Sequence, residues 1–171
     1  METIRKNLTW RNKPSVAKGN LAEAIVKEFL QNKGFIVYEP VTDGAHGFDM
    51  LAVKDKKQFI IAECKAKAKR TKYDDTGFNI RHYFEYKFVQ EKHGIPVFVF
   101  FIDEHLMEIY GNFLAKLEKE TLHEGEQYPK WHNGIVYFPM CNMLRDIARL
   151  TEKDSDALKS YSRRNYEYLE K

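Results

Sequence analysis

The sequence predicts an α/β fold, in which a central mixed β-sheet is flanked by helices. Three helical patterns lead to this prediction. One precedes the first strand-like segments, one separates two apolar strands, and one closes the chain. With 171 residues, of which 43% are hydrophobic and 14% aromatic, the chain can bury one core. We therefore expect a single domain over 18–171, preceded by a basic arm at 1–17.

The first expected helix covers 18–33. Leu21, Ile25 and Phe29 recur four residues apart, which gives the segment one apolar face, and Gly34 provides the stop.

Three strands are expected next, at 35–38, 48–53 and 58–65. The short break at 55–57 makes the second and third of them hairpin partners. The apolar run in 58–65 is continuous enough for a central strand.

A second helix is expected at about 79–92, with Ile80, Phe84 and Phe88 toward the core and Tyr83 near the surface. Further along, the pattern predicts the following elements: a strand at 97–102, an edge strand at 106–113, helix plus loop at 114–126, a last strand at 135–138, a short helix at 140–150, and a final helix capped by Thr151.

Charged side chains interrupt the predicted central strand. Because side chains alternate along a strand, Glu63 and Lys65 share a face, and the hairpin places Asp49 opposite or nearly opposite Glu63. Two carboxylates suit a hard divalent cation such as Mg²⁺, and a lysine can stabilise charge on an attacked phosphate. The alternative is an exposed Glu63–Lys65 ion pair; unpaired charge in a central strand is costly, which favours the cation site.

Net charge is only +3, so overall charge hardly selects a partner, but the cations are unevenly distributed. Five of them fall within eight positions beside the predicted site: Lys65, Lys67, Lys69, Arg70 and Lys72. This pattern suits a face turned toward a polyanion, and a solvated lysine-rich loop explains it about as well.

The segment Gly47-Phe48-Asp49, followed by Glu63-Cys64-Lys65, resembles the PD-(D/E)xK, or restriction-endonuclease-like, nuclease superfamily. The resemblance covers the core motif region 18–102, and leaves 103–171 as a C-terminal elaboration. Phe48 stands where the usual motif has proline. Within the superfamily the chain is most similar to Holliday junction resolvases and small phage nucleases.

The resemblance implies a metal-dependent DNA endonuclease, selective for branched structures if it follows the resolvases. It implies Mg²⁺ as cofactor, with Mn²⁺ as a substitute, and DNA as partner, and it permits a homodimer. Asp49 and Glu63 would be metal ligands together with the backbone carbonyl of Cys64, and Lys65 the catalytic lysine. The alternative on the same fold is a catalytically silent nucleic-acid-binding or assembly protein.

Members of the superfamily also place an acid on the first helix, which makes Glu23 a candidate catalytic residue. A solvated Glu23–Lys27 pair explains Glu23 equally well. We expect the phosphate contacts to come from the basic loop and the second helix, at Lys67, Lys69, Arg70, Lys72, Arg81 and Lys87.

Other polar groups have simpler interpretations. His46 and the Asp103-Glu104-His105 segment fit turn chemistry, and Cys64 fits a small core residue. The amino end lacks the apolar stretch of a signal peptide, and no apolar run reaches the roughly 20 residues of a membrane helix. We therefore expect a soluble, cytoplasmic protein.

Overall fold

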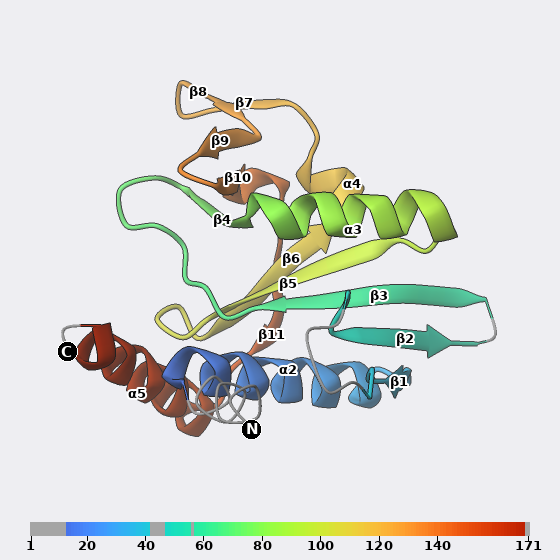
Figure 1. Cartoon of the computed structure of the whole chain (residues 1–171), viewed down its shortest axis with the longest axis horizontal. Coiled ribbons are helices and arrows are strands. Elements are labelled where there is room, and N and C mark those ends of the chain that lie inside the picture. The colour runs from blue at the N-terminus through green and yellow to red at the C-terminus, as the bar shows by residue number, and fades with distance from the viewer. Residues whose placement is uncertain (1–12, 42–46, 56, 170–171) are drawn as a thin grey trace, which may run out of the picture.

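A computed structural model describes residues 13–41, 47–55 and 57–169, with side chains as far as residue 162. Its centre is a six-stranded sheet in the order β1-β2-β3-β5-β6-β11 (Figure 1). Neighbours β3 and β5 are parallel and the other pairs are antiparallel, so the predicted mixed α/β architecture is confirmed. The strands are β1 (Ile36–Tyr38), β2 (Met50–Lys54), β3 (Gln58–Lys65), β5 (Val97–Asp103), β6 (Glu108–Phe113) and β11 (Leu144–Arg149).

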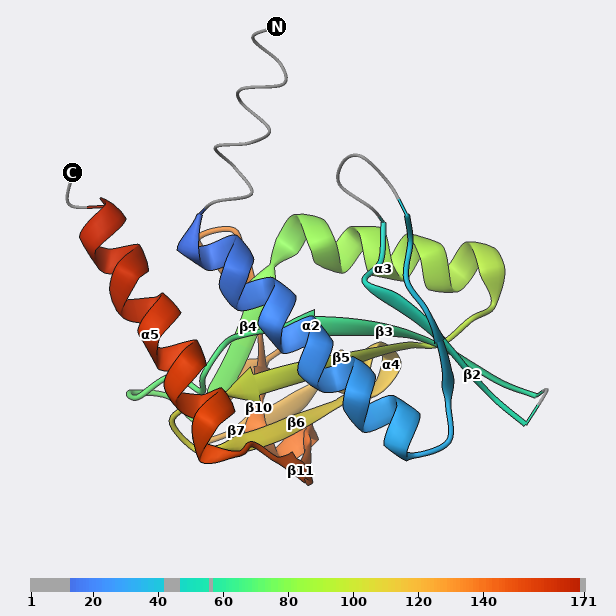
Figure 2. The same ribbon diagram turned by 90° about the horizontal axis from the view of Figure 1, so that it is seen from below.

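Two helices cover one face of this sheet, α2 (Pro14–Asn32) and α5 (Glu152–Leu169), which lie side by side (Figure 2). Helix α2 begins at Pro14, inside the predicted arm, because proline is favoured in a first helical turn. Gly34 follows its end with φ +85°, a conformation that glycine adopts readily. Thr151 caps α5 as predicted, accepting a hydrogen bond from the Asp154 backbone N–H at 3.1 Å.

Helix α3 (Ile80–His93) and a small second sheet cover the other face (Figure 1). The second sheet has the order β4-β10-β9, and a separate hairpin joins β7 to β8. These elements are β4 (Asp75–Asn79), β7 (Thr121–His123), β8 (Glu126–Tyr128), β9 (Lys130–His132), β10 (Ile135–Pro139), the single turn α4 (Leu114–Leu117) and the 3-10 turn η1 (Met140–Asn142).

The prediction of a helix at 140–150 is wrong, because β11 occupies most of that segment. Strand β11 pairs with β6, so β6 is not an edge strand and the strand at 135–139 is not the last. The pairing register shifts between Leu144 and Ala148, and Asp146 has φ +53°. This bulge breaks the alternation by which a strand is recognised in a sequence.

The prediction for 114–126 is only partly right, since the helix is one turn and the β7–β8 hairpin follows it.

The predicted apolar stripe of α3 is wrong as well. Phe84 and Phe88 are 58% and 60% exposed, whereas Tyr83 and Tyr86 are each 4% exposed. Both sets recur at helical spacing; the tyrosines face inward because their hydroxyls find carboxylate partners there, Glu118 for Tyr83 and Glu63 for Tyr86.

The β2–β3 hairpin sets the position of the predicted site. The ladder ends with the pair of Met50 and Ala62, and both side chains are buried against α2. Because side chains alternate, the next residues, Asp49 and Glu63, lie on the opposite face, toward α3. Among the described residues, no helix is long and apolar enough to cross a membrane.

Candidate functional site

Each of the two acids, Asp49 and Glu63, accepts a hydrogen bond from a backbone N–H at or next to the other acid. The Asp49 backbone N–H donates to Glu63 Oε1 at 3.1 Å, and the Cys64 N–H donates to Asp49 Oδ2 at 2.7 Å. Lys65 Nζ lies 3.5 Å from Glu63 Oε2. The structure therefore brings together the three side chains that the sequence singled out, at the carboxyl end of β3.

The Glu63 side chain is only 1% exposed. Burial, and then the neighbouring Asp49 carboxylate, raise the pKa of Glu63 to about 8, although Lys65 and a hydrogen bond from Tyr86 oppose the rise. One ammonium, that of Lys65, thus lies beside two carboxylates. The site is not the exposed Glu63–Lys65 pair of the alternative interpretation.

Tyr86, on the buried side of α3, contacts two of these groups. Its hydroxyl lies close enough to Glu63 to lower the pKa of that carboxyl, and Lys65 Nζ lies 5.1 Å from the centroid of its ring. Burial and the charge of Glu63 raise the pKa of Tyr86, so it remains a donor. The sequence pattern did not single out Tyr86 because the stripe Ile80, Phe84 and Phe88 was expected to face the core.

His82 lies one turn before Tyr86, with the two ring centroids 6.0 Å apart. The His82 side chain is exposed on the helix, and partial desolvation followed by the charge of Lys65 lowers its pKa. Sequence analysis did not assign it a role.

The far side of β3 meets α2. Cys64 is 8% exposed and packs in the core, as predicted. Burial, then the charges of Asp49, Glu63 and Glu23, raise the pKa of its thiol. Glu23 therefore lies close enough to β3 to act on Cys64, but on the α2 face of the sheet. Lys27 pairs with Glu39.

The chemistry of the donor set fits a divalent cation. Mg²⁺ prefers oxygen ligands and commonly takes one or two carboxylates, with waters and substrate phosphate completing its shell. Asp49 and Glu63 supply such oxygens in a place where negative charge is in excess. The Cys64 backbone lies beside the Asp49 carboxylate, consistent with its carbonyl as a third ligand.

The expected phosphate-binding residues differ in whether their charged groups already have acidic partners. Arg70 makes two hydrogen bonds of 2.5 Å to Asp75, which is fully buried and also accepts from the Tyr128 hydroxyl. The guanidinium of Arg70 thus supports the fold, while Lys67 and Lys72 are exposed. The remaining three candidates all have acidic partners: Lys69 with Asp74, Arg81 with Glu85 and Lys87 with Glu118.

Asp74, His123 and Glu124 form another group whose ligand atoms lie within 4.8 Å of one another. Asp74 is already engaged there, by Lys69 at 3.0 Å and by His123 Nε2 at 3.0 Å. A cation would have to displace the Lys69 ammonium, so this group fits a metal less well than Asp49 and Glu63.

Two other expectations concern turns. Asp103 Oδ1 accepts from the backbone N–H groups of His105 and Leu106, at 2.9 and 3.0 Å, so turn chemistry explains this segment as predicted. His46 lies outside the described residues.

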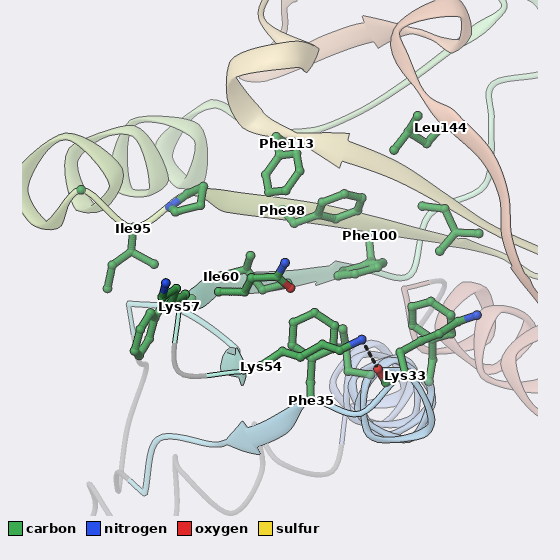
Figure 3. Close-up of a pocket in the computed structure, with 17 residues that line it drawn as sticks. Lys33, Phe35, Lys54, Lys57, Ile60, Ile95, Phe98, Phe100, Phe113 and Leu144 are labelled. Carbon is green, nitrogen blue, oxygen red and sulfur yellow. Dashed lines mark hydrogen bonds between the residues drawn. The ribbon is translucent and has the colours of Figure 1, made fainter.

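A cavity of about 1000 Å³ lies away from these acids (Figure 3). It opens beside the start of β3 and is lined mainly by phenylalanine and aliphatic side chains, among them Phe35, Phe98 and Phe113, with Lys33 and Lys54 at its edge. Because no carboxylate of the described residues lines it, this cavity lacks the metal-binding groups of the Asp49–Glu63 site.

No family model matches the chain, and no curated protein matches it. Among solved structures, it is similar to Hjc, a Holliday junction resolvase from the archaeal hyperthermophile Archaeoglobus fulgidus, with a TM-score of 0.53 and 11% identity. The match covers 73% of this chain and 86% of that one. The fold is restriction-endonuclease-like. At this identity, the likeness establishes the fold alone.

Proposed function

We propose that the protein is a metal-dependent nuclease that hydrolyses phosphodiester bonds in DNA. The observation that carries the proposal is the pair of acids formed by buried Glu63 and half-buried Asp49, with the single ammonium of Lys65 beside them. The fold shared with a junction resolvase supports the proposal, and makes branched DNA the first substrate to test.

Asp49, Glu63 and the Cys64 carbonyl would hold Mg²⁺ or Mn²⁺. When bound, the cation would polarise a phosphate oxygen and lower the pKa of a water at the site. Lys65 would donate to the phosphate as negative charge grows on it during attack. Tyr86 keeps the Lys65 ammonium and the Glu63 carboxylate in place through its ring and its hydroxyl.

Glu23 stands outside this core set, because α2 lies on the opposite face of the sheet. We retain it as a candidate catalytic residue acting from the strand end, where its charge reaches Cys64. A homodimer, as in enzymes that cut two strands symmetrically, is part of the same proposal.

The test combines cleavage with metal binding. Supercoiled plasmid and a synthetic four-way junction are incubated with wild type, Asp49→Asn and Lys65→Ala, in Mg²⁺, Mn²⁺ or EDTA. Lys116→Ala, which removes an exposed cation on α4, is the matched control. Calorimetric Mn²⁺ titration measures binding independently of cleavage.

We expect cleavage by wild type and the control only, and Mn²⁺ binding that Asp49→Asn loses and Lys65→Ala keeps. Cleavage that persists in both site variants would remove the assignment. Equal DNA binding by all proteins, without cutting in any metal, would instead favour the catalytically silent binding protein.

A further inference from the structure

A second concave site lies at the same end of the sheet, a cleft of about 660 Å³ between α2, α5 and the segment after β3. Its walls carry the ammonium groups of Lys18, Lys67 and Lys159 and a single carboxylate, Glu104. Its Lys67 follows Lys65 of the proposed metal site by two residues, and the Lys67 backbone N–H donates to the Lys65 carbonyl at 2.8 Å.

The cations outnumber the acid in this cleft. Lys18 pairs with Glu104 at 2.7 Å, whereas Lys67 and Lys159 have no acidic partner within ion-pair distance among the described residues. Lys67 is exposed at the mouth, yet partial burial and the charge of Lys65 lower the pKa of its ammonium. An anion bound between Lys67 and Lys159 would bring negative charge to the Lys67 ammonium and favour its charged form.

Glu104 gives a second, independent indication of a ligand. Its side chain is 3% exposed, and Oε1 accepts from Lys18 and, at 3.1 Å, from the Ser162 hydroxyl. Its other oxygen, Oε2, is enclosed and has no hydrogen-bond partner in the described part of the chain. A buried acceptor without a donor is costly, so a ligand that brings an N–H or O–H group would stabilise it.

We propose that this cleft binds one nucleotide unit of the nucleic acid, with its phosphate between Lys67 and Lys159 and an N–H or O–H of its base or sugar on Glu104. A nucleotide carries both the anion and the donor that the cleft lacks. This proposal rests on the proposed function, which it extends from the cut bond to a neighbouring nucleotide.

The test measures binding rather than cleavage. Fluorescence anisotropy in EDTA follows a labelled 20-base-pair duplex and a four-way junction across a series of salt concentrations. The proteins are wild type, Lys67→Gln/Lys159→Gln, Glu104→Gln and the control Lys116→Gln, each checked for folding by circular dichroism.

We expect the double variant to bind about tenfold more weakly, and the slope of log K against log salt to fall by about one, as for one lost phosphate contact. The control should match wild type. Glu104→Gln, which frees Lys18 but removes the charged acceptor, should also weaken binding. Unchanged affinity and slope in the double variant would overturn the site, and tighter binding by Glu104→Gln would overturn its donor contact.

Chemical-shift titrations with inorganic phosphate and deoxyadenosine monophosphate identify the form of the ligand. Shifts at Ala66 and Ser162 that the double variant abolishes would show that a free mononucleotide or phosphate suffices. Shifts elsewhere only, together with DNA binding that the variants weaken, would assign the cleft to a phosphate within a strand.

If wild type neither cuts DNA nor binds Mn²⁺ but the variants still weaken DNA binding, the proposed function fails and the cleft stands. If wild type cuts and the variants bind normally, the cleft alone fails.

Discussion

Glu63 and Glu108 are both buried carboxylates on strands of the same sheet, but their surroundings are opposite. Glu108 accepts from Arg145 Nε at 2.7 Å, from a second Arg145 nitrogen, and from the Asp146 N–H at 2.7 Å. Those contacts with Arg145 hold the pKa of Glu108 below its usual range. Glu63 instead faces a second acid, Asp49, which directly precedes β2, and burial together with that charge raises the pKa of Glu63 to about 8.

The difference separates a carboxylate that holds the fold from one that is available for chemistry. At Glu108 the compensating cation is Arg145, whose bidentate contact joins β11 to β6. At Glu63 one ammonium, that of Lys65, lies beside two carboxylates. A buried acid whose pKa is raised lowers the stability of the fold at neutral pH when it ionises. Such acids are common at functional sites.

The largest expected effect is on cleavage. Lys65→Gln removes the charge that would meet the attacked phosphate, so we expect kcat to fall by about 10²–10³-fold with Mn²⁺ affinity retained. Single-turnover cleavage and Mn²⁺ calorimetry measure the two quantities. A loss of Mn²⁺ binding would show instead that Lys65 acts by shaping the metal site.

The next effect tests the Glu108 side of the comparison. Glu108→Gln breaks the contact with Arg145, whose side chain is 44% exposed, so we expect a loss of about 1–3 kcal/mol in the free energy of unfolding at pH 7. Because the folded pKa is depressed, the Glu108 contribution is present above its unfolded pKa and is lost as pH falls through the folded value. Urea denaturation of wild type and variant at pH 7 and below 4 checks both statements.

Glu63→Gln should act in the opposite direction in metal-free protein. The folded pKa is raised, so ionised Glu63 lowers stability as pH rises from its unfolded pKa, near 4.5, to about 8. In EDTA at pH 9 we expect the variant to be more stable by about 1–3 kcal/mol, with the gain vanishing below pH 4.5. Thermal unfolding across pH measures it, and a variant less stable than wild type at pH 9 contradicts the comparison.

The smallest effect concerns Tyr86. Tyr86→Phe keeps the ring beside Lys65 and removes the hydroxyl from Glu63, so we expect Mn²⁺ affinity about tenfold weaker with a normal fold. Tyr83→Phe, which removes the hydroxyl that bonds Glu118 at 2.7 Å, is the matched control and should leave Mn²⁺ affinity unchanged. Equal Mn²⁺ affinity in wild type and Tyr86→Phe would remove Tyr86 from the site.

Sequence patterns predicted what local rules determine. The β2–β3 hairpin, and with it the approach of Asp49 to Glu63, follows from alternation and a short turn. Strand β11 was hidden because the bulge at Asp146 interrupts its alternation. Which side of α3 faces the sheet depends on carboxylates far along the chain, Glu63 and Glu118, so helical spacing alone did not select Tyr83 and Tyr86.

The sequence also did not predict which basic residues pair with acids. A run of cations from Lys65 to Lys72 reads as one surface, but Arg70 turns inward to Asp75, which lies in a second sheet. Only the three-dimensional arrangement separates cations that hold the fold from those, such as Lys67, that face a cleft.

The hairpin that carries Asp49 and Glu63 closes at its opposite end, between Lys54 and Gln58, more than a dozen ångströms of strand away from both acids. The ladder from Met50–Ala62 to Lys54–Gln58 holds the spacing of the acids, whatever the closing turn contains. Extra residues, an affinity tag or a fluorophore should therefore be tolerated at that turn while the acids keep their spacing. It offers a place to attach a reporter to an otherwise unmodified protein.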